Sequence, residues 1–373
     1  MQQRDASRFP GRARVLSSLS VHDHRFTNPW PGAQPPHGWR DLLRWSRERG
    51  WRPPGGSEPP PHFELATPAF SSPRAARDLL GATWVGHSTV LVQLGSLNIL
   101  TDPMWSERAS PLRSLGPRRV APPGVAMESL PPIDVVLLSH DHYDHLDAPT
   151  VRRLARLQPE AHWMAPLGLA QFLRRLGVHR VTELGWWDET TLGEARIACV
   201  PARHFGARGF TDRMRRLWCG WTLRVADHAL YFAGDTAYHP EFAKIGQRYG
   251  PFDIVLVPIG AYDPRWFMER VHMDPEEAVR AFIEVSGGAP PAAQGSRRAP
   301  RVALGIHWGT FRLTDEPMDE PPRRMRSAWG AAGLPENELW ILRHGETREL
   351  DLSAPDSRYG DASPTDASPT PPR

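Results

Sequence analysis

The sequence contains very little cysteine: Cys199 and Cys219 are the only two among 373 residues. Two cysteines cannot build the disulfide framework of a small secreted fold, and their spacing differs from that of a zinc knuckle. Both fall in predicted strands, so we expect two free thiols that pack in the core. Free thiols are typical of a reducing compartment, which favours a cytoplasmic location.

Long hydrophobic runs are also missing. We expect no transmembrane helix, because no stretch of about 18 apolar residues occurs. The N-terminal residues lack the apolar segment of a signal peptide. Four tryptophans nevertheless fall in one short stretch: Trp30, Trp39, Trp45 and Trp51. Packing of an N-terminal segment onto the core is the favoured explanation, and peripheral contact with a membrane is the alternative.

Charge of one sign does not accumulate either. The net charge is only +3, which gives no reason to expect a nucleic-acid partner. The hydrophobic share of 40% and the charged share of 23% are ordinary for a globular protein. We expect residues 1–25 to be disordered and residues 26–350 to form one domain with an N-terminal wrap. Residues 354–373, in which SPT recurs, should form a disordered tail.

One short stretch carries most of the chemistry. Residues 133–147 read IDVVLLSHDHYDHLD. The β-branched apolar run is typical of a buried strand, and Asp147-Ala148-Pro149 is typical of a helix start. The connection between them holds four potential metal ligands: His140, His142, Asp144 and His145. Imidazole and carboxylate groups bind zinc, iron or manganese, so this spacing indicates a site for two neighbouring ions.

Three later residues follow predicted strands in the same way: His204, Asp235 and His307. Each is weak evidence alone, but together with HxHxDH they can complete a dinuclear site. Asp102 either braces the histidine loop or only makes a turn. His87 and His272 either face the site or pack as structural histidines. Tyr143, inside the motif, could reach a substrate.

The pattern HxHxDH after a strand resembles the signature of the metallo-β-lactamase superfamily. The resemblance implies an α/β fold, namely a four-layer αβ/βα sandwich, and a hydrolase with two Zn²⁺ ions, with Mn²⁺ or Fe²⁺ as alternatives. It assigns His140, His142 and His204 to one ion, Asp144, His145 and His307 to the other, and Asp235 to a bridge between them. A hydroxide shared by the ions would then attack phosphorus or a carbonyl carbon.

Longer segments narrow the resemblance to one family. It is carried by WVGHSTVLVQL from Trp84, FAGDTAYHPEFAKIGQRYGPFDIVLVPIGAYDPRWFM from Phe232, HMDPEEA from His272 and IHWGTF from Ile306. These segments resemble N-acylphosphatidylethanolamine-hydrolysing phospholipases D and their bacterial relatives, over roughly Phe26 to His344. The resemblance implies a phosphodiesterase that releases phosphatidic acid and an N-acylethanolamine.

The same resemblance implies a homodimer with an apolar surface that faces the membrane. By matching position it also places Tyr143 and His272 near the active site. The catalytic candidates are therefore Asp144, Tyr143 and His272.

Departures from the family pattern keep other functions open. After His204 the chain reads FGARGFTDRMRRLWCGW, and the loop from Ser286 to Pro300 looks lengthened. A soluble lactonase or a small-molecule phosphodiesterase would use the same site, and a non-catalytic metal-binding protein would keep it without turnover. The arginines after His204 either meet an acidic headgroup or form a solvated basic loop. They are Arg208, Arg213, Arg215 and Arg216.

Overall fold

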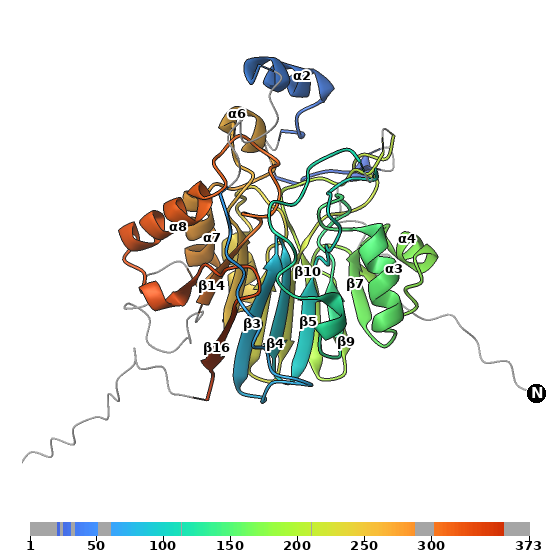
Figure 1. The fold of residues 1–373 in the computed structure, drawn as a ribbon, viewed down its shortest axis with the longest axis vertical. Helices are drawn as coiled ribbons and strands as arrows, with labels where there is room; N and C mark the ends of the chain where they lie inside the picture. Colours follow the sequence, from blue (N-terminus) through green and yellow to red (C-terminus); the bar gives the residue numbers. More distant parts are fainter. Residues whose placement is uncertain are drawn as a thin grey trace, which may run out of the picture.

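The computed structural model describes residues 21–22, 25–30, 34–50, 61–112, 114–209, 211–287 and 302–353. Two mixed seven-stranded sheets pack face to face, and helices cover both outer faces (Figure 1). This arrangement is the four-layer α/β sandwich, so the predicted fold class is confirmed.

The first sheet combines an antiparallel meander with three parallel strands. Its order is β16-β3-β4-β5-β6-β7-β8. In chain order the strands are β3 (Leu79–Gly86), β4 (Thr89–Leu94), β5 (Leu97–Thr101), β6 (Val135–Leu137), β7 (His162–Pro166), β8 (Val181–Leu184) and β16 (Thr347–Asp351). Its outer face carries α3 (Ala148–Leu157) and α4 (Ala170–Arg175), and η1 (Met127–Ser129) precedes β6.

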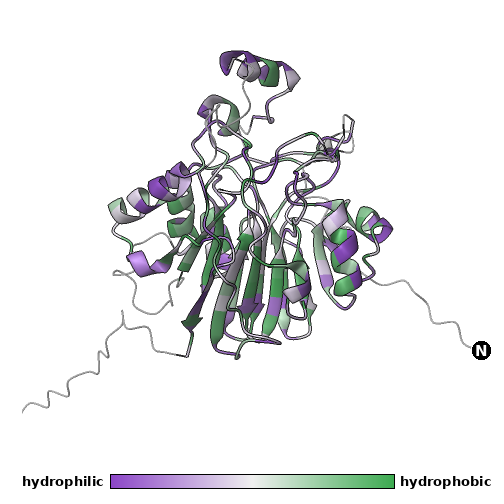
Figure 2. Cartoon of the chain, viewed as in Figure 1, coloured by the Kyte–Doolittle hydropathy of each residue, from purple (hydrophilic) through white to green (hydrophobic). Residues whose placement is uncertain are grey.

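Strand β6 shows how this sheet divides two hydrophobic clusters. Val135 and Leu137 belong to the cluster between the sheets, whereas Val136 packs in the cluster that includes Val151 of α3. Successive side chains of a strand point to opposite faces, so a run that is apolar throughout must be buried on both. Figure 2 shows this concentration of hydrophobic residues in the strands.

The second sheet has the order β15-β14-β13-β12-β11-β10-β9. In chain order the strands are β9 (Glu189–Leu192), β10 (Ala195–Val200), β11 (Gly220–Val225), β12 (His228–Phe232), β13 (Ile254–Pro258), β14 (Val302–Ile306) and β15 (Leu339–Trp340). Its flanking helices are α5 (Phe242–Tyr249), α7 (Pro275–Val285) and α8 (Glu320–Ala331), with η3 (Glu336–Glu338) before β15. Phe282 of α7 packs against Trp329 of α8, with ring centroids 4.8 Å apart.

Two helix starts follow the sequence signals. The Asp147 side chain caps α3 by accepting a hydrogen bond from the Thr150 amide, with Pro149 in the first turn. The Asp274 and Glu277 side chains form a capping box at the start of α7. Both helices therefore begin where the sequence places them.

The N-terminal elements lie at the same end of the molecule as the loops described below. Strand β1 (Val21–His22) pairs with β2 (Arg25–Phe26), while α2 (Trp39–Glu48) stands beside α6 (Arg265–Met268) (Figure 1). Among the described residues, no helix has the length and apolarity needed to cross a bilayer. The tail 354–373, residues 288–300 of the lengthened loop and residues 1–20 lie outside the described residues.

Candidate metal centre

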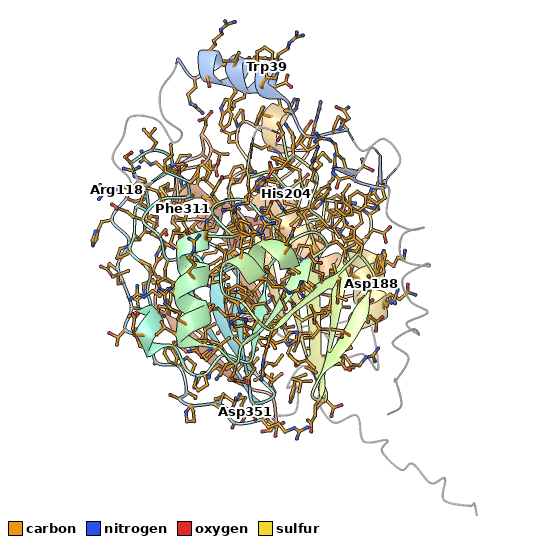
Figure 3. The ribbon with its side chains drawn as sticks, turned by 90° about the vertical axis from the view of Figure 1, so that its right-hand side faces the viewer. Trp39, Arg118, Asp188, His204, Phe311 and Asp351 are labelled. Carbon is orange, nitrogen blue, oxygen red and sulfur yellow. The ribbon has the colours of Figure 1, made fainter. Side chains whose placement is uncertain are left out.

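The structure brings all seven predicted ligands together. They lie on the loops that follow β6, β10, β12 and β14, all at the same end of the two sheets. This end lies below α2, and Asp351 lies at the opposite end (Figure 3). Five of the seven side chains are buried, and His142 and Asp144 are partly exposed. Ligands on loops fixed by rigid strands form a preorganised site.

The first group contains only histidines: His140, His142 and His204. The Nδ1 atom of His142 lies 2.9 Å from His140 Nε2 and 3.2 Å from His204 Nε2. Three imidazole nitrogens therefore converge on one point from two loops. This is the arrangement required to hold a single ion.

The second group contains three predicted ligands, Asp144, His145 and His307, together with His87. The Oδ2 atom of Asp144 lies 3.4 Å from His145 Nε2 and 3.5 Å from His307 Nε2. Asp235 lies between the two groups. Its Oδ2 is 3.0 Å from His307 Nε2 and 3.8 Å from His204 Nε2, so one carboxylate reaches both sides of the centre.

Buried partners orient the histidine rings. Asp102 accepts a hydrogen bond from His145 Nδ1 at 2.6 Å, and the Ser139 hydroxyl accepts one from His140 Nδ1 at 2.8 Å. His204 Nδ1 donates to the Val271 carbonyl at 2.9 Å. In each ring the Nδ1 proton is engaged, so Nε2 keeps the lone pair that a metal needs.

Asp102 therefore braces the histidine loop as well as following a strand end. It also accepts hydrogen bonds from the amide and hydroxyl of Ser139, at 2.7 and 2.5 Å. Sequence reasoning missed Ser139 and the Val271 carbonyl. Ser139 could have been found from the pairing of β5 with β6. These strands are parallel, with Thr101 opposite Leu137, so the residues that follow them, Asp102 and Ser139, come close together.

Both uncertain histidines face the cluster. His87 Nε2 donates to Asp144 Oδ2 at 2.9 Å, and His272 Nε2 lies 3.9 Å from Asp235 Oδ2. Tyr143 differs, because its hydroxyl donates to the Arg208 carbonyl at 2.6 Å. Its ring lines an open pocket of about 820 Å³ beside the motif, so Tyr143 is adjacent to the cluster rather than part of it.

Strained backbone accompanies these side chains. His87, Asp102 and His307 have positive φ angles of 57°, 27° and 62°, which non-glycine residues seldom adopt. Such conformations persist where the surrounding structure fixes them, and they gather at functional sites. Gly234 has φ +62°, and a Cβ there would lie 2.6 Å from Ser139 Cβ, so the turn before Asp235 requires glycine.

The two groups differ in the charge of their histidines. Burial lowers the pKa of His142 to about 4 and that of His204 to about 3, so both rings are neutral. Burial also opposes protonation of His307, but Asp235 and Asp144 raise its pKa to about 9. Despite burial, His145 holds the pKa values of both Asp144 and Asp235 well below their ordinary range.

The donor set fits divalent metal ions. Several buried polar atoms have no hydrogen-bond partner in the described part of the chain: His145 Nε2, Asp235 Oδ1 and both ring nitrogens of His307. Polar atoms buried without a hydrogen bond are costly, and two of these atoms, His145 Nε2 and His307 Nε2, lie 3.1 and 3.0 Å from Asp235 Oδ2. Despite burial, Asp235 and Asp144 raise the pKa values of His145 and His307, and a divalent cation would meet the same negative charge.

The comparisons agree with this site. Residues 97–308, more than half of the chain, match the Beta-lactamase superfamily domain. The chain belongs to this superfamily and is a metal-dependent hydrolase. It is 43% identical over 274 residues to an uncharacterized protein of Mycobacterium tuberculosis, with 73% of this chain and 69% of that protein covered.

A second relative has a named activity. The N-acyl-phosphatidylethanolamine-hydrolyzing phospholipase D 1 of Caenorhabditis elegans is 41% identical over 263 residues, which cover 68% of this chain and 70% of that protein. Among solved structures, a metallo hydrolase from the archaeon Ignicoccus hospitalis matches with a TM-score of 0.52 and 22% identity, covering 73% of this chain and 98% of that one. The structural likeness supports the fold alone.

Proposed function

We propose that the protein is a dinuclear zinc phosphodiesterase of the phospholipase D type, which cleaves N-acylphosphatidylethanolamine-like lipids to phosphatidic acid and an N-acylethanolamine. The observation that carries the proposal is Asp235, whose Oδ2 lies within 3.9 Å of histidine Nε2 atoms from both ligand groups. The identity to the C. elegans relative supports the lipid substrate.

The site residues divide the work of hydrolysis. His140, His142 and His204 would hold one ion, Asp144, His145 and His307 the other, and Asp235 would share its two oxygens between them. Zinc ions bound there would lower the pKa of water and stabilise negative charge that develops on the phosphate. His272 lies beside Asp235 and would contact the phosphoryl oxygens, while Tyr143 would line the path of the substrate from the adjoining pocket.

Helix α2 supports a lipid substrate. Trp39 is 67% exposed, Leu42 48% and Leu43 37%, and arginines at positions 40, 44 and 47 are exposed beside them. The helix is anchored by Trp45, which donates to Asp315 and packs 4.9 Å from the Phe267 ring. We therefore propose that α2 inserts its apolar residues into an anionic membrane surface, at the same end of the molecule as the metal centre. The cytoplasmic location and the homodimer stay predictions.

Product analysis tests the reaction. Zinc-loaded protein is incubated with N-acylphosphatidylethanolamine in mixed micelles, and the products are identified by mass spectrometry. Phosphatidic acid with N-acylethanolamine is expected from the native protein and not from the Asp144→Asn variant. If the native protein instead cleaves only a water-soluble phosphodiester or a lactone, the lipid assignment is wrong and the hydrolase centre stands. Metal binding without any turnover would contradict both.

Vesicle sedimentation tests the membrane contact. The double variant Trp39→Ser/Leu42→Ser should bind vesicles of phosphatidylcholine and phosphatidylglycerol several-fold more weakly, while its turnover of a soluble phosphodiester is unchanged. Leu157 on α3 is 43% exposed, so Leu157→Ser is a matched control that should bind like the native protein. Equal binding by all three proteins would exclude α2 as the contact.

A further inference from the structure

The first ligand group is assembled from two separate loops. His140 and His142 follow β6, whereas His204 lies in the loop between β10 and β11, more than sixty residues further along the chain. Three imidazoles can bind one ion only if these loops keep a fixed separation. A connection between the loops would therefore act directly on the geometry of the site.

Asp141 supplies one end of such a connection. It stands between the two ligands His140 and His142, and its side chain is fully buried at 0% exposure. Its Oδ2 accepts a hydrogen bond from Arg216 NH1 at 2.7 Å, across 75 positions of sequence. A buried carboxylate requires such a partner, because an unpaired charge in the interior is strongly unfavourable.

Arg216 is itself held by its own loop. The same NH1 atom donates to Asp212 Oδ2 at 2.8 Å, and Asp212 Oδ1 accepts from the amides of Arg208 and Gly209 at 3.1 and 2.6 Å. The arginine is thus fixed in the loop that carries His204 while it binds the carboxylate of the other loop.

Arg208 makes a second bridge between the loops. Its NH1 donates to the carbonyls of Asp141 and Leu146, at 2.7 and 2.6 Å, and so spans the whole ligand-bearing turn. Its guanidinium lies 4.1 Å from the Tyr143 ring centroid. Gly206 lets the loops approach this closely, because a Cβ at that position would lie 2.8 Å from Asp141 Oδ1.

We infer that Arg216 and Arg208 are positioning residues that fix the distance between the His140–His142 pair and His204, with Asp141 as their shared anchor. The inference rests on the proposed metal centre and explains what holds its two ligand-bearing loops at a fixed distance. Partners of ligand residues commonly change metal affinity or activity by 10- to 100-fold when they are altered. Two of the four arginines for which the sequence left a solvated basic loop or a headgroup contact open, Arg208 and Arg216, thus have a third role.

Metal binding without substrate tests the inference. Zinc affinity is measured by chelator competition, and Co²⁺ in place of zinc reports ligand geometry through its visible absorption spectrum. Arg216→Gln should weaken one of the two zinc-binding events by about 10- to 100-fold and alter the cobalt spectrum. Arg216→Lys keeps a cation between the two carboxylates and should stay within a few-fold of the native affinity.

A matched control lies on the same loop. Arg215 is exposed, and within the described residues its side chain makes no polar contact, so Arg215→Gln should match the native protein in both measurements. If Arg216→Gln does not fold, the double variant Asp141→Ala/Arg216→Ala replaces it, because removal of both partners leaves no unpaired buried carboxylate. Circular dichroism identifies the folded samples.

The outcomes separate positioning from general stability. A folded variant without the Arg216 contact that melts earlier but keeps native zinc affinity and the native cobalt spectrum would overturn the inference. Weaker affinity with an altered spectrum, rescued by lysine, would establish it. Because no lipid is present, failure of the substrate assignment would appear only in the product analysis and leave this result unaffected.

Discussion

The two ligand groups differ in what holds them in place. His140, His142 and His204 are neutral because burial lowers their pKa values, and the Asp235 carboxylate lies 3.9 Å from His140 Nε2 and 3.8 Å from His204 Nε2, further than from the second group. In the other group, Asp144 and Asp235 face His145 and His307, whose pKa values are raised. The comparison teaches that the histidine group depends on the fixed geometry of its loops, whereas the second group is already attracted by opposite charges.

The largest effect should come from the residue shared by both groups. Asp235→Asn removes the charge that faces His145 and His307 and replaces one of the two carboxylate oxygens with an amide nitrogen, which is a poor metal ligand. We expect hydrolysis to fall by at least roughly 10³-fold. Bound zinc, measured by elemental analysis, should fall on both sides. The exposed Asp227→Asn in the β11–β12 turn is the matched control, and a variant that keeps full zinc content would contradict the shared role.

A smaller effect should separate the groups. Asp102 orients His145 through a 2.6 Å hydrogen bond. Asp102→Asn should therefore lower the zinc affinity of the second group more than that of the first. We expect one zinc-binding event to weaken by about 10- to 100-fold and the other by only a few-fold. Chelator competition measures both. Equal weakening of the two events would show that the groups are not independent.

Substitution of Ser139 should have the opposite selectivity and lower the zinc affinity of the first group more than that of the second. The Ser139 hydroxyl accepts from His140 Nδ1, so Ser139→Ala removes a neutral partner from the first group. Because a neutral hydrogen bond contributes less than a charged one, we expect a loss of roughly 10-fold or less in the affinity of one zinc-binding event. The cobalt spectrum should change slightly. A larger loss than that of Asp102→Asn would reverse the order argued here.

Local signals in the sequence predicted much of this centre. The motif HxHxDH predicted four ligand positions, and residues after strand ends predicted His204, Asp235 and His307, because parallel strands bring their ends to one edge. The start of helix α3 was predicted from Asp147-Ala148-Pro149, and Asp147 caps the helix there. These features depend on neighbours in sequence or on strand ends, which a single sequence reveals.

Other features depend on contacts between distant residues, which no local sequence pattern predicts. The Arg216–Asp141 pair joins residues 75 positions apart, and no local pattern relates them. Strand β16 was missed because it lies at the edge of its sheet, where its residues Thr347–Asp351 are polar and mostly half-exposed. Helix α8 was not predicted; its Pro321 and Pro322 lie in the first turn, where proline is tolerated.

The smallest effect tests, at a histidine outside the metal centre, whether burial alone lowers a histidine pKa. His239 is buried between the Trp30 and Phe242 rings, with centroids 4.8 and 4.0 Å away. Burial and Arg203 lower its pKa from 6.5 to about 3. Below pH 6.5 the unfolded chain takes up a proton at this position and the folded chain does not. Stability present above pH 6.5 is therefore lost as the pH falls toward 3.

His239→Phe should remove this contribution. Between pH 6 and pH 4 the free energy of unfolding of the variant should fall less steeply than that of the native protein, by at most about 1.4 kcal/mol per pH unit. Urea titrations of zinc-free protein measure both slopes, and His179→Phe at an exposed position should keep the native slope. Identical slopes for all three proteins would mean that burial alone does not keep a histidine neutral in this fold, and the neutrality of the His140 group would then require the metal.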